Sequence, residues 1–406
     1  MYCHFHTLRN GLRLIHLPSD SPVAYCGFAV RAGARDELPG EAGLAHFVEH
    51  LLFKGTRKRR TWHILNRMEA VGGELNAYTS KEETFVYSVF LADDFERAVE
   101  LMSDLVINSQ FPGREMEKER TVVLDEIRSY MDNPSELIAD EFEDMIFAGH
   151  PLGHSILGDR KSLLSFCRES CFSFVKRYYT APEMVFFSMG RMDFRRVVRL
   201  SEKYLSDVPV DAAVRCETQP PSAPPVQAVK KKRTHQTHVM TGGRAYGIFD
   251  GRQTTLMLLN DIVGGPGMNS RLNVSLRERN GLVYHVESCV SAYTDTGVFA
   301  IYFGSDPKQR EKALELIEKE LRGLRENKLS DARLSAAKKQ ATGQVGVAVD
   351  NRENLFLGMG KSFLHRNCYD APEEVFRKIN AVTATQLCDA ANEIFAPERM
   401  FLLIYE

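Results

Sequence analysis

The pattern of apolar and polar residues in the first third of the chain predicts strands and helices in blocks. Two early runs, LRLIHL and VAYCGFAV, are rich in strand-forming residues and predict strands over about residues 11–17 and 23–31. Two further strands are predicted near residues 75–79 and 84–91. Mixed strands with longer helical segments between them favour the α+β fold class.

The helical segments carry apolar residues three or four positions apart and end at residues that stop a helix. Gly55, the pair Gly72 and Gly73, and Pro134 act as these stops. The predicted helices cover about residues 41–53, 61–71, 93–108 and 114–131.

The two halves of the chain share part of this pattern. When Ala98 is placed on Ala313, DFERAVEL resembles REKALELI at an offset of 215 residues. The same offset places GLAHFVEH of residues 43–50 on LLNDIVGG of residues 258–265. Two matches at one offset predict a duplication. We therefore expect two tandem homologous domains, each a mixed, largely antiparallel sheet covered by helices.

A proline-rich segment separates the two halves. The stretch SDVPVDAAVRCETQPPSAPPVQAVKKKR has the composition of a linker and little periodicity. It predicts a first domain over residues 1–207, a linker over 208–233 and a second domain over 234–406. Domains of roughly 200 residues are also what a chain of 406 residues favours.

Composition and charge narrow the choice of partners and compartment. The 44% apolar and 26% charged residues are typical of a soluble globular protein, and a net charge of −2 predicts no general attraction to nucleic acid or to a membrane. The basic runs KGTRKRR and KKKR are interpreted as solvated surface charge. The start of the chain has no apolar signal segment, no stretch is apolar enough to span a membrane, and the eight cysteines are scattered without a CxxC motif. We therefore expect reduced thiols and a cytoplasmic location.

The first predicted helix carries polar residues where a core is expected. His46 and His50 are one turn apart, so both imidazoles can reach one metal ion, and Glu49 lies close enough to meet a water beside it. A pair of hydrogen-bonded core histidines is the alternative interpretation. In the second copy Asp261, Gly264 and Gly265 take these three positions, so only the first half keeps the metal-like residues.

The helix predicted over residues 114–131 offers the third ligand. Glu119 and Glu126 are seven residues apart and share a face with Val122 and Val123, which predicts burial. Two buried carboxylates require a positive partner, and a divalent cation provides one. We assign Glu126 as a ligand and Glu119 as the carboxylate that hydrogen-bonds a ligand histidine, with an ordinary surface charge as the alternative for Glu119.

Several motifs in the same order resemble the pitrilysin/insulysin and mitochondrial processing peptidase family. AHFVEHLLFKGT contains HxxEH, the reverse of HExxH and the inverzincin motif, and the family's glutamate ligand about 76 residues later falls on Glu126. The likeness covers nearly the whole chain and is that of a two-domain bacterial-type member. The further motifs that carry it are GGELNAYTSKEETFVYS, ERTVVLDEI, PLGHSILG and SRLNVSLRERNGLVYHV.

This resemblance implies a zinc-dependent endopeptidase that cleaves short or unfolded peptides in an enclosed chamber. His46, His50 and Glu126 would hold one zinc ion per chain, and Glu49 would be the general base that takes a proton from the attacking water. Glu119 would support a ligand histidine.

The resemblance also implies how substrate is held. Asn76 and Ala77 would contact the backbone of a peptide that adds to the sheet as an extra strand, and Arg277 and Tyr284 would hold the substrate and donate to the scissile carbonyl oxygen. We expect a homodimer in which Arg277 and Tyr284 of one chain complete the site of the other.

Simpler interpretations remain for these residues. Asn76 could cap a turn, Arg277 could be a solvated side chain, and Tyr284 could pack in a strand. The family also contains non-catalytic members, so a structural subunit, or a chain that needs a metal-free partner, is the alternative function.

Overall fold

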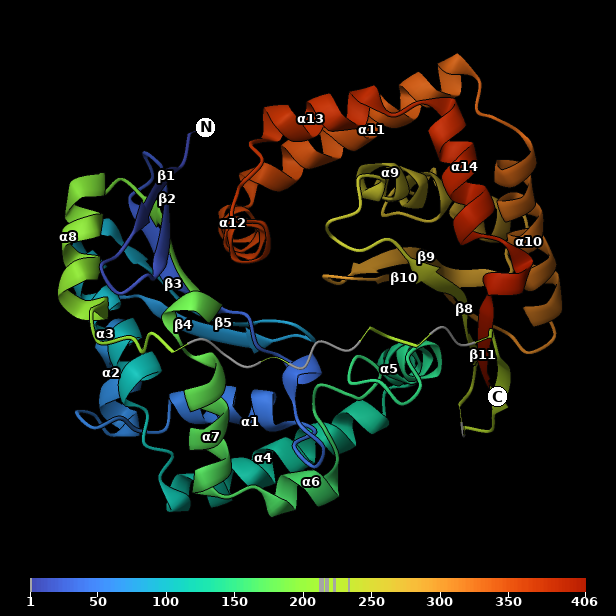
Figure 1. The fold of residues 1–406 in the computed structure, drawn as a ribbon. Coiled ribbons are helices and arrows are strands. Elements are labelled where there is room, and N and C mark those ends of the chain that lie inside the picture. The colour runs from blue at the N-terminus through green and yellow to red at the C-terminus, as the bar shows by residue number, and fades with distance from the viewer. Residues whose placement is uncertain (1, 212–214, 216–218, 222–223, 233) are drawn as a thin grey trace. The chain divides into compact units, whose positions relative to one another are not determined.

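The computed structural model describes residues 2–211, 215, 219–221, 224–232 and 234–406 and contains two mixed sheets with helices packed on them (Figure 1). This arrangement confirms the predicted α+β class and the strands and helices expected in the first third of the chain. The strands are β1(His4–Thr7), β2(Arg13–Pro18), β3(Val23–Val30), β4(Glu74–Thr79), β5(Thr84–Leu91), β6(Met184–Gly190), β7(Gln227–Lys230), β8(Thr237–Ala245), β9(Val283–Ala292), β10(Gly297–Ser305) and β11(Phe401–Tyr405). The α-helices are α1(Leu44–Leu52), α2(Thr61–Glu69), α3(Phe95–Asn108), α4(Gly113–Met131), α5(Pro134–Ile146), α6(Arg160–Ser165), α7(Arg168–Tyr178), α8(Phe194–Leu205), α9(Gln253–Val263), α10(Arg310–Glu326), α11(Asp331–Asp350), α12(Arg352–Arg366), α13(Pro372–Ala381) and α14(Ala384–Ile394).

The two sheets have the same topology. The first has the strand order β1-β2-β6-β3-β5-β4 and the second β7-β11-β8-β10-β9. Apart from β1, each strand of the first sheet has a counterpart in the second, and in both sheets the one parallel pair lies at the same place, β2 with β6 and β7 with β11. The counterpart helices α3 and α10 begin 215 residues apart, at Phe95 and Arg310, as the sequence offset predicted. The duplication is therefore confirmed.

Each sheet is apolar on both faces because its strands alternate between two cores. In β3, Cys26 and Phe28 belong to the large core under α1, α3, α7 and α8, whereas Tyr25 and Ala29 face a second core that contains α12. In the second sheet, Leu403 and Tyr405 of β11 contact α5 in the same way. Helices therefore cover both faces of each sheet.

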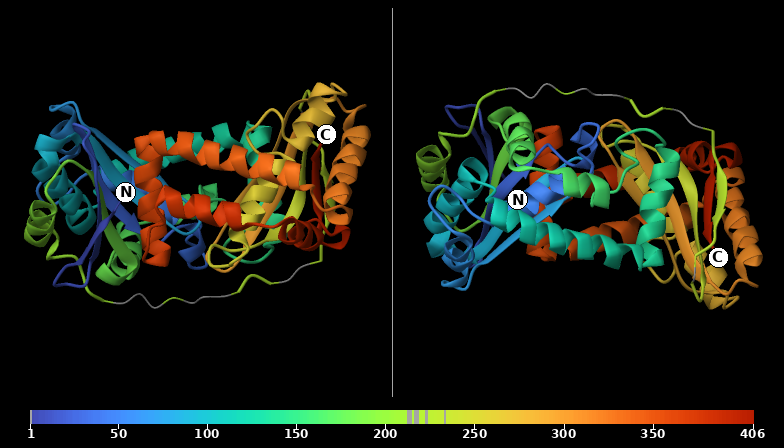
Figure 2. Two further views of the ribbon diagram at one scale, coloured as in Figure 1. Left: turned by 90° about the horizontal axis from the view of Figure 1, so that it is seen from above. Right: turned by 90° about the horizontal axis from the view of Figure 1, so that it is seen from below.

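The chain forms two compact units that exchange one helix each. The first contains Met1–Ser129, His154–Glu217 and Ala348–Ala371, and the second contains Tyr130–Gly153, Thr218–Val347 and Pro372–Glu406. Thus α5 packs in the unit of the second sheet and α12 in the unit of the first, and their colours in Figure 2 differ clearly from those of the strands they cover. Pattern analysis of a single chain cannot reveal this exchange, since an apolar helix face fits either sheet. The domain boundaries at residues 207 and 234 stay a prediction, and part of the predicted linker lies outside the described residues.

Aromatic stacking and a buried ion pair hold α12 in the first unit. Phe356 is fully buried and stacks on Phe187 of β6, with ring centroids 4.2 Å apart. Glu83 is buried beside Lys361 and His365 of α12, with 3.1 Å from its Oε2 to His365 Nε2. Burial alone would raise the pKa of Glu83, but these two partners lower it to about 2. Glu83 therefore stays charged and holds α12 in the first unit through Lys361 and His365.

None of the helices in the described part of the chain combines the length and the apolar character needed to cross a bilayer. Seven of the eight cysteines are described, and all seven are free thiols. Cys216 lies outside the described residues.

We predict that Phe356→Ala lowers the free energy of unfolding by about 3–5 kcal/mol, because it leaves a cavity beneath α12 and removes the stack on Phe187. Urea unfolding followed by circular dichroism measures this change. Phe249→Ala is the matched control, since Phe249 is 60% exposed, and should change the free energy little. Equal effects of the two substitutions would contradict this account of α12.

Candidate metal centre

A buried carboxylate fixes the start of α1, the helix that carries HxxEH. Glu37 accepts hydrogen bonds from the backbone N–H groups of Gly43, at 2.9 Å, and Ala45, at 2.8 Å. The first N–H groups of a helix have no partner within the helix, so Glu37 supplies acceptors that would otherwise be missing. Burial raises the pKa of Glu37, while hydrogen bonds from His154 and from these amides act against that rise.

The segment 151–158, PLGHSILG, packs directly against this start. Gly43 has a φ of +90°, and a Cβ there would lie 2.6 Å from the carbonyl oxygen of Leu157. Only glycine allows both that backbone conformation and that contact. No motif in the sequence assigned a role to Glu37 or His154, and their hydrogen bonds in the structure show that they fix the start of the helix of the site.

The predicted metal ligands come together in the first compact unit. The Nε2 atoms of His46 and His50 are 3.2 Å apart, and Oε2 of Glu126, from α4, is 3.7 Å from each of them. Among the residues that the structure describes, this is the one group of three or more potential ligands whose donor atoms all lie within 4.8 Å of one another.

These distances fit a tetrahedral zinc ion. Zinc holds nitrogen and oxygen ligands at about 2.0–2.2 Å, which puts two ligand atoms about 3.3–3.6 Å apart. Two histidines and one glutamate also form a ligand set of catalytic zinc, which leaves its fourth position open. A hydrogen-bonded pair of core histidines would account for the 3.2 Å contact but not for Glu126 beside both rings.

Both histidines direct Nε2 toward Glu126. Burial, together with the nearby His50, lowers the pKa of His46 to about 3, so this imidazole is neutral at physiological pH. His50 Nδ1 lies 3.2 Å from Oε2 of Glu119. The other ring nitrogen, Nε2, is the one that faces His46 and Glu126 and could bind a cation.

Glu119, the predicted supporting carboxylate, lies beside His50. It is 7% exposed, and its other oxygen lies 2.7 Å from Nζ of Lys54. Glu119 therefore joins Lys54 and His50 through its two carboxylate oxygens, and these two contacts fix its position behind the ring of His50. Lys54 belongs to the basic run that was interpreted as solvated surface charge, and for this residue that interpretation is wrong.

The sequence predicted that the face of α4 that carries Glu119 and Glu126 is buried, and this prediction is wrong in part. Val123 is buried, but Val122 is 49% exposed and the side chain of Glu126 is 43% exposed. Seven residues return a helix to nearly the same face but advance it about 10 Å along its axis. Glu119 therefore lies beside His50 in a buried setting, whereas Glu126 lies where solvent has access.

Glu49 stands beside the three ligands and is held by one hydrogen bond. The hydroxyl of Thr79, the last residue of β4, donates to Oε2 of Glu49 at 2.9 Å. Burial raises the pKa of Glu49, the bond from Thr79 and the charge of His50 lower it, and the charge of Glu126 raises it again. The sequence analysis missed Thr79, although it lies within the motif GGELNAYTSKEETFVYS.

Asn76 and Ala77 lie on an edge strand. β4 is the last strand of the first sheet and pairs only with β5, where Asn76 is opposite Tyr87 and Ala77 is opposite Val86. α1 packs on β4, and Thr79 continues the same strand to Glu49. An unpaired strand edge therefore runs beside the metal ligands, where an extended peptide can add to the sheet.

Arg277 and Tyr284 belong to the second compact unit, whereas the three predicted ligands belong to the first. Arg277 lies in a π-helix, η4(Asn273–Glu278), and its nearest ionic partner is Glu278 at 3.8 Å. Tyr284 lies on β9, the edge strand of the second sheet, and is 85% exposed. A packed strand tyrosine, the simpler interpretation of Tyr284, is therefore wrong.

Comparison with known proteins places these observations in a wider group. Residues 14–160 match the family model described as insulinase (peptidase family M16), and residues 165–341 match the one described as peptidase M16 inactive domain. A protein of Mycobacterium leprae named as a zinc protease is 32% identical over 96% of this chain and 88% of its own length. A protein of Bacillus subtilis that is named as an uncharacterized zinc protease is 29% identical over 98% of this chain and 97% of its own length.

Two solved structures have the same fold. A peptidase M16 inactive domain from Pseudomonas fluorescens superposes with a TM-score of 0.93 at 19% identity, covering 100% of this chain and 98% of its own. A protease from Helicobacter pylori superposes with a TM-score of 0.91 at 21% identity, covering 100% of this chain and 99% of its own.

We predict that Glu119→Gln weakens zinc binding about 10–100-fold, because the amide keeps the shape of the side chain but loses the charge that orients His50 and pairs with Lys54. Competition with a chromophoric chelator measures the affinity. Glu117→Gln is the control on the same helix, since the side chain of Glu117 is 72% exposed, and should leave the affinity unchanged. An unaltered affinity in Glu119→Gln would refute the supporting role.

Proposed function

The chain belongs to the insulinase family, peptidase family M16, and we propose that it is a zinc-dependent endopeptidase that cleaves short or unfolded peptides in an enclosed chamber. The observation that carries the proposal is the convergence of His46, His50 and Glu126 within 4.8 Å, with Glu49 on the same turn of α1.

The residues of the first unit fit the steps of peptide hydrolysis. Zinc, when bound, would polarise the scissile carbonyl and make the attacking water more acidic. Glu49 is the general base, and its raised pKa makes its carboxylate a stronger proton acceptor. Thr79 holds one oxygen of Glu49 and leaves the other for the proton, which passes next to the leaving amine.

The edge strand β4 fits a substrate held by its main chain. A peptide added beside Asn76 and Ala77 would use the backbone groups that β4 does not share with β5. Recognition of this kind reads extended backbone rather than particular side chains. It therefore favours short or unfolded chains over folded proteins.

We further propose that Arg277 and Tyr284 of a second copy of the chain complete the site of the first. Both side chains are largely exposed, and neither is engaged by a strong ionic contact among the described residues. A guanidinium and a phenol are suited to hold a peptide and to donate to its carbonyl oxygen as negative charge develops there.

A non-catalytic structural subunit is the competing function. Such a subunit has no need of a general base, of three converging ligands or of a buried carboxylate behind one of them. All of these are present in this chain, which favours the peptidase.

We predict that Glu49→Gln retains one zinc ion per chain and lowers the turnover of an unstructured fluorogenic peptide by about 10²–10⁴-fold or more. The ligands stay intact, so only the proton transfer is lost. Zinc is measured by elemental analysis and turnover by fluorescence, with Glu69→Gln on the exposed face of α2 as the control. Turnover near the wild-type rate in Glu49→Gln would exclude this mechanism, and a zinc-free wild type without turnover would favour the structural subunit.

A complementation experiment tests the shared site. Glu49→Gln and Tyr284→Phe should each be inactive alone. When the two are co-expressed, a site built from both copies restores about a quarter of the wild-type activity, because half of the dimers are mixed and each mixed dimer holds one intact site of two. If the co-expressed variants are no more active than each variant alone, Tyr284 does not complete the site of the second chain.

A further inference from the structure

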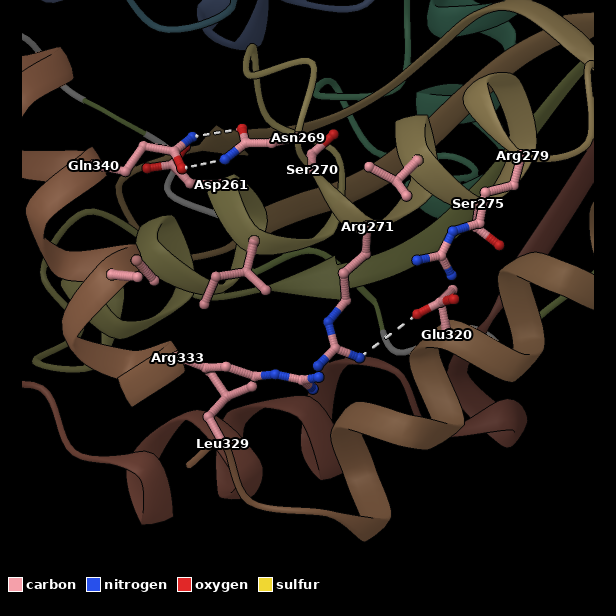
Figure 3. Close-up of a pocket in the computed structure, with 14 residues that line it drawn as sticks. Asp261, Asn269, Ser270, Arg271, Ser275, Arg279, Glu320, Leu329, Arg333 and Gln340 are labelled. Carbon is pink, nitrogen blue, oxygen red and sulfur yellow. Dashed lines mark hydrogen bonds and ion pairs between the residues drawn. The ribbon is translucent and has the colours of Figure 1, made fainter. Parts of the chain in front are cut away.

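The second compact unit contains a cavity of about 380 Å³ that the proposed peptidase chemistry does not use (Figure 3). It lies among α9, the segment through η4, α10 and α11. By chain order and sheet topology these are the counterparts of α1, α2, α3 and α4. The cavity is therefore formed by the same elements that bring the metal ligands together in the first unit.

The second unit has no room for a metal site of the first kind. α9 ends at Val263, so the counterparts of Glu49 and His50 fall beyond the helix, at Gly264 and Gly265. A Cβ on Gly264 would lie 2.8 Å from the backbone nitrogen of Ser288, and one on Gly265 would lie 2.7 Å from Cα of Asp261. Backbone occupies the space that the ligand side chains would need.

The charge of the second cavity is opposite in sign to that of the metal centre. Three arginines, Arg271, Arg279 and Arg333, line it, against two carboxylates, Asp261 and Glu320. In the first unit, Glu49, Glu119 and Glu126 surround the two histidines instead. The duplicated elements have thus kept a cavity and exchanged a cluster of acidic groups for one of guanidinium groups.

These guanidinium groups are poorly compensated by the protein itself. Arg271 contacts Oε2 of Glu320 at the long distance of 3.5 Å, and burial together with the charge of Arg333 lowers its pKa. Within the described residues, the side chains of Arg279 and Arg333 make no hydrogen bond or ion pair. Figure 3 shows the side chain of Arg333 extending toward Arg271. Unpaired guanidinium groups around a concavity favour an oxyanion.

The remaining lining has two kinds of surface. Ser270 is 4% exposed, and its buried hydroxyl has no hydrogen-bond partner among the described residues. Ile262, Val274 and Leu329 supply apolar wall, while an amide pair between Asn269 and Gln340, at 2.8 and 3.1 Å, crosses one side. A cavity of this volume is larger than a bare inorganic anion needs, and its apolar wall suits an organic body.

We propose that this cavity is a binding site for a small organic anion that carries one carboxylate or phosphate group on an apolar body. Arg271, Arg279 and Arg333 bind the charged group, and Ser270 donates a further hydrogen bond. The apolar wall covers the body. The site is separate from the metal ligands and independent of hydrolysis.

Titration calorimetry on the full zinc-loaded chain tests this site with four probes: N-acetyl-leucine, its neutral amide, phenyl phosphate and inorganic phosphate. We expect saturable binding of an organic anion, about tenfold or more tighter than that of the amide. The double variant Arg279→Gln/Arg333→Gln should weaken this binding by a similar factor. Tighter binding of N-acetyl-leucine assigns a carboxylate, and tighter binding of phenyl phosphate assigns a phosphate.

Lys339→Gln is the control for the loss of positive charge, since Lys339 is exposed on α11 and does not line the cavity. It should leave binding unchanged. The double variant would still bind a probe anion at the metal centre. Loss of binding in this variant therefore assigns the anion to the cavity of the second unit. The proposal would be overturned if neither organic anion bound more tightly than the amide, if inorganic phosphate bound most tightly, or if binding were insensitive to the double variant. The thermal unfolding curve of the double variant verifies that it is folded.

Discussion

The structure of the first unit depends on one unfavourable arrangement: two imidazoles on a single turn of a largely buried helix, opposite a carboxylate from another helix. The Nε2 atoms of His46 and His50 and Oε2 of Glu126 lie 3.2–3.7 Å from one another. Polar groups gathered in a largely buried setting need partners, and a divalent ion would satisfy all three at once. The contacts around these three groups hold them at this spacing.

That constraint is imposed by layers of contacts behind the ligands. Glu37 and His154 fix the start of α1, and the 151–158 segment packs on Gly43, where no side chain fits. Lys54 and Glu119 then fix the ring of His50 from the opposite side. The pKa of His46, lowered to about 3 by burial, keeps that ring neutral, and Thr79 orients Glu49. Each partner is polar and mostly buried, so each is satisfied only when the others are in place.

The duplicated unit shows what the same topology does without these residues. Its five strands repeat the order of the first sheet, and its helices follow in the same sequence, but α9 ends before the positions that complete HxxEH in α1. Glycine at 264 and 265 lets backbone close over the place where ligands would stand. Since a fold fixes elements and not the chemistry between them, one copy gathers acceptors for a cation and the other gathers donors for an anion.

The sequence by itself determined the strands and helices of the first third, the duplication at an offset of 215 residues, and the choice of His46, His50 and Glu126 as candidate ligands. The elements follow from the periodicity of neighbouring residues, and the other two follow from the order and spacing of motifs along the chain. The tertiary structure alone decided that α5 and α12 pack in exchanged units, that Glu126 is exposed while Glu119 is buried, and that Lys54, Thr79, Glu37 and His154 support the site. These facts join residues far apart in the chain, and no period along a sequence encodes which distant surface an apolar face or a charged side chain will meet.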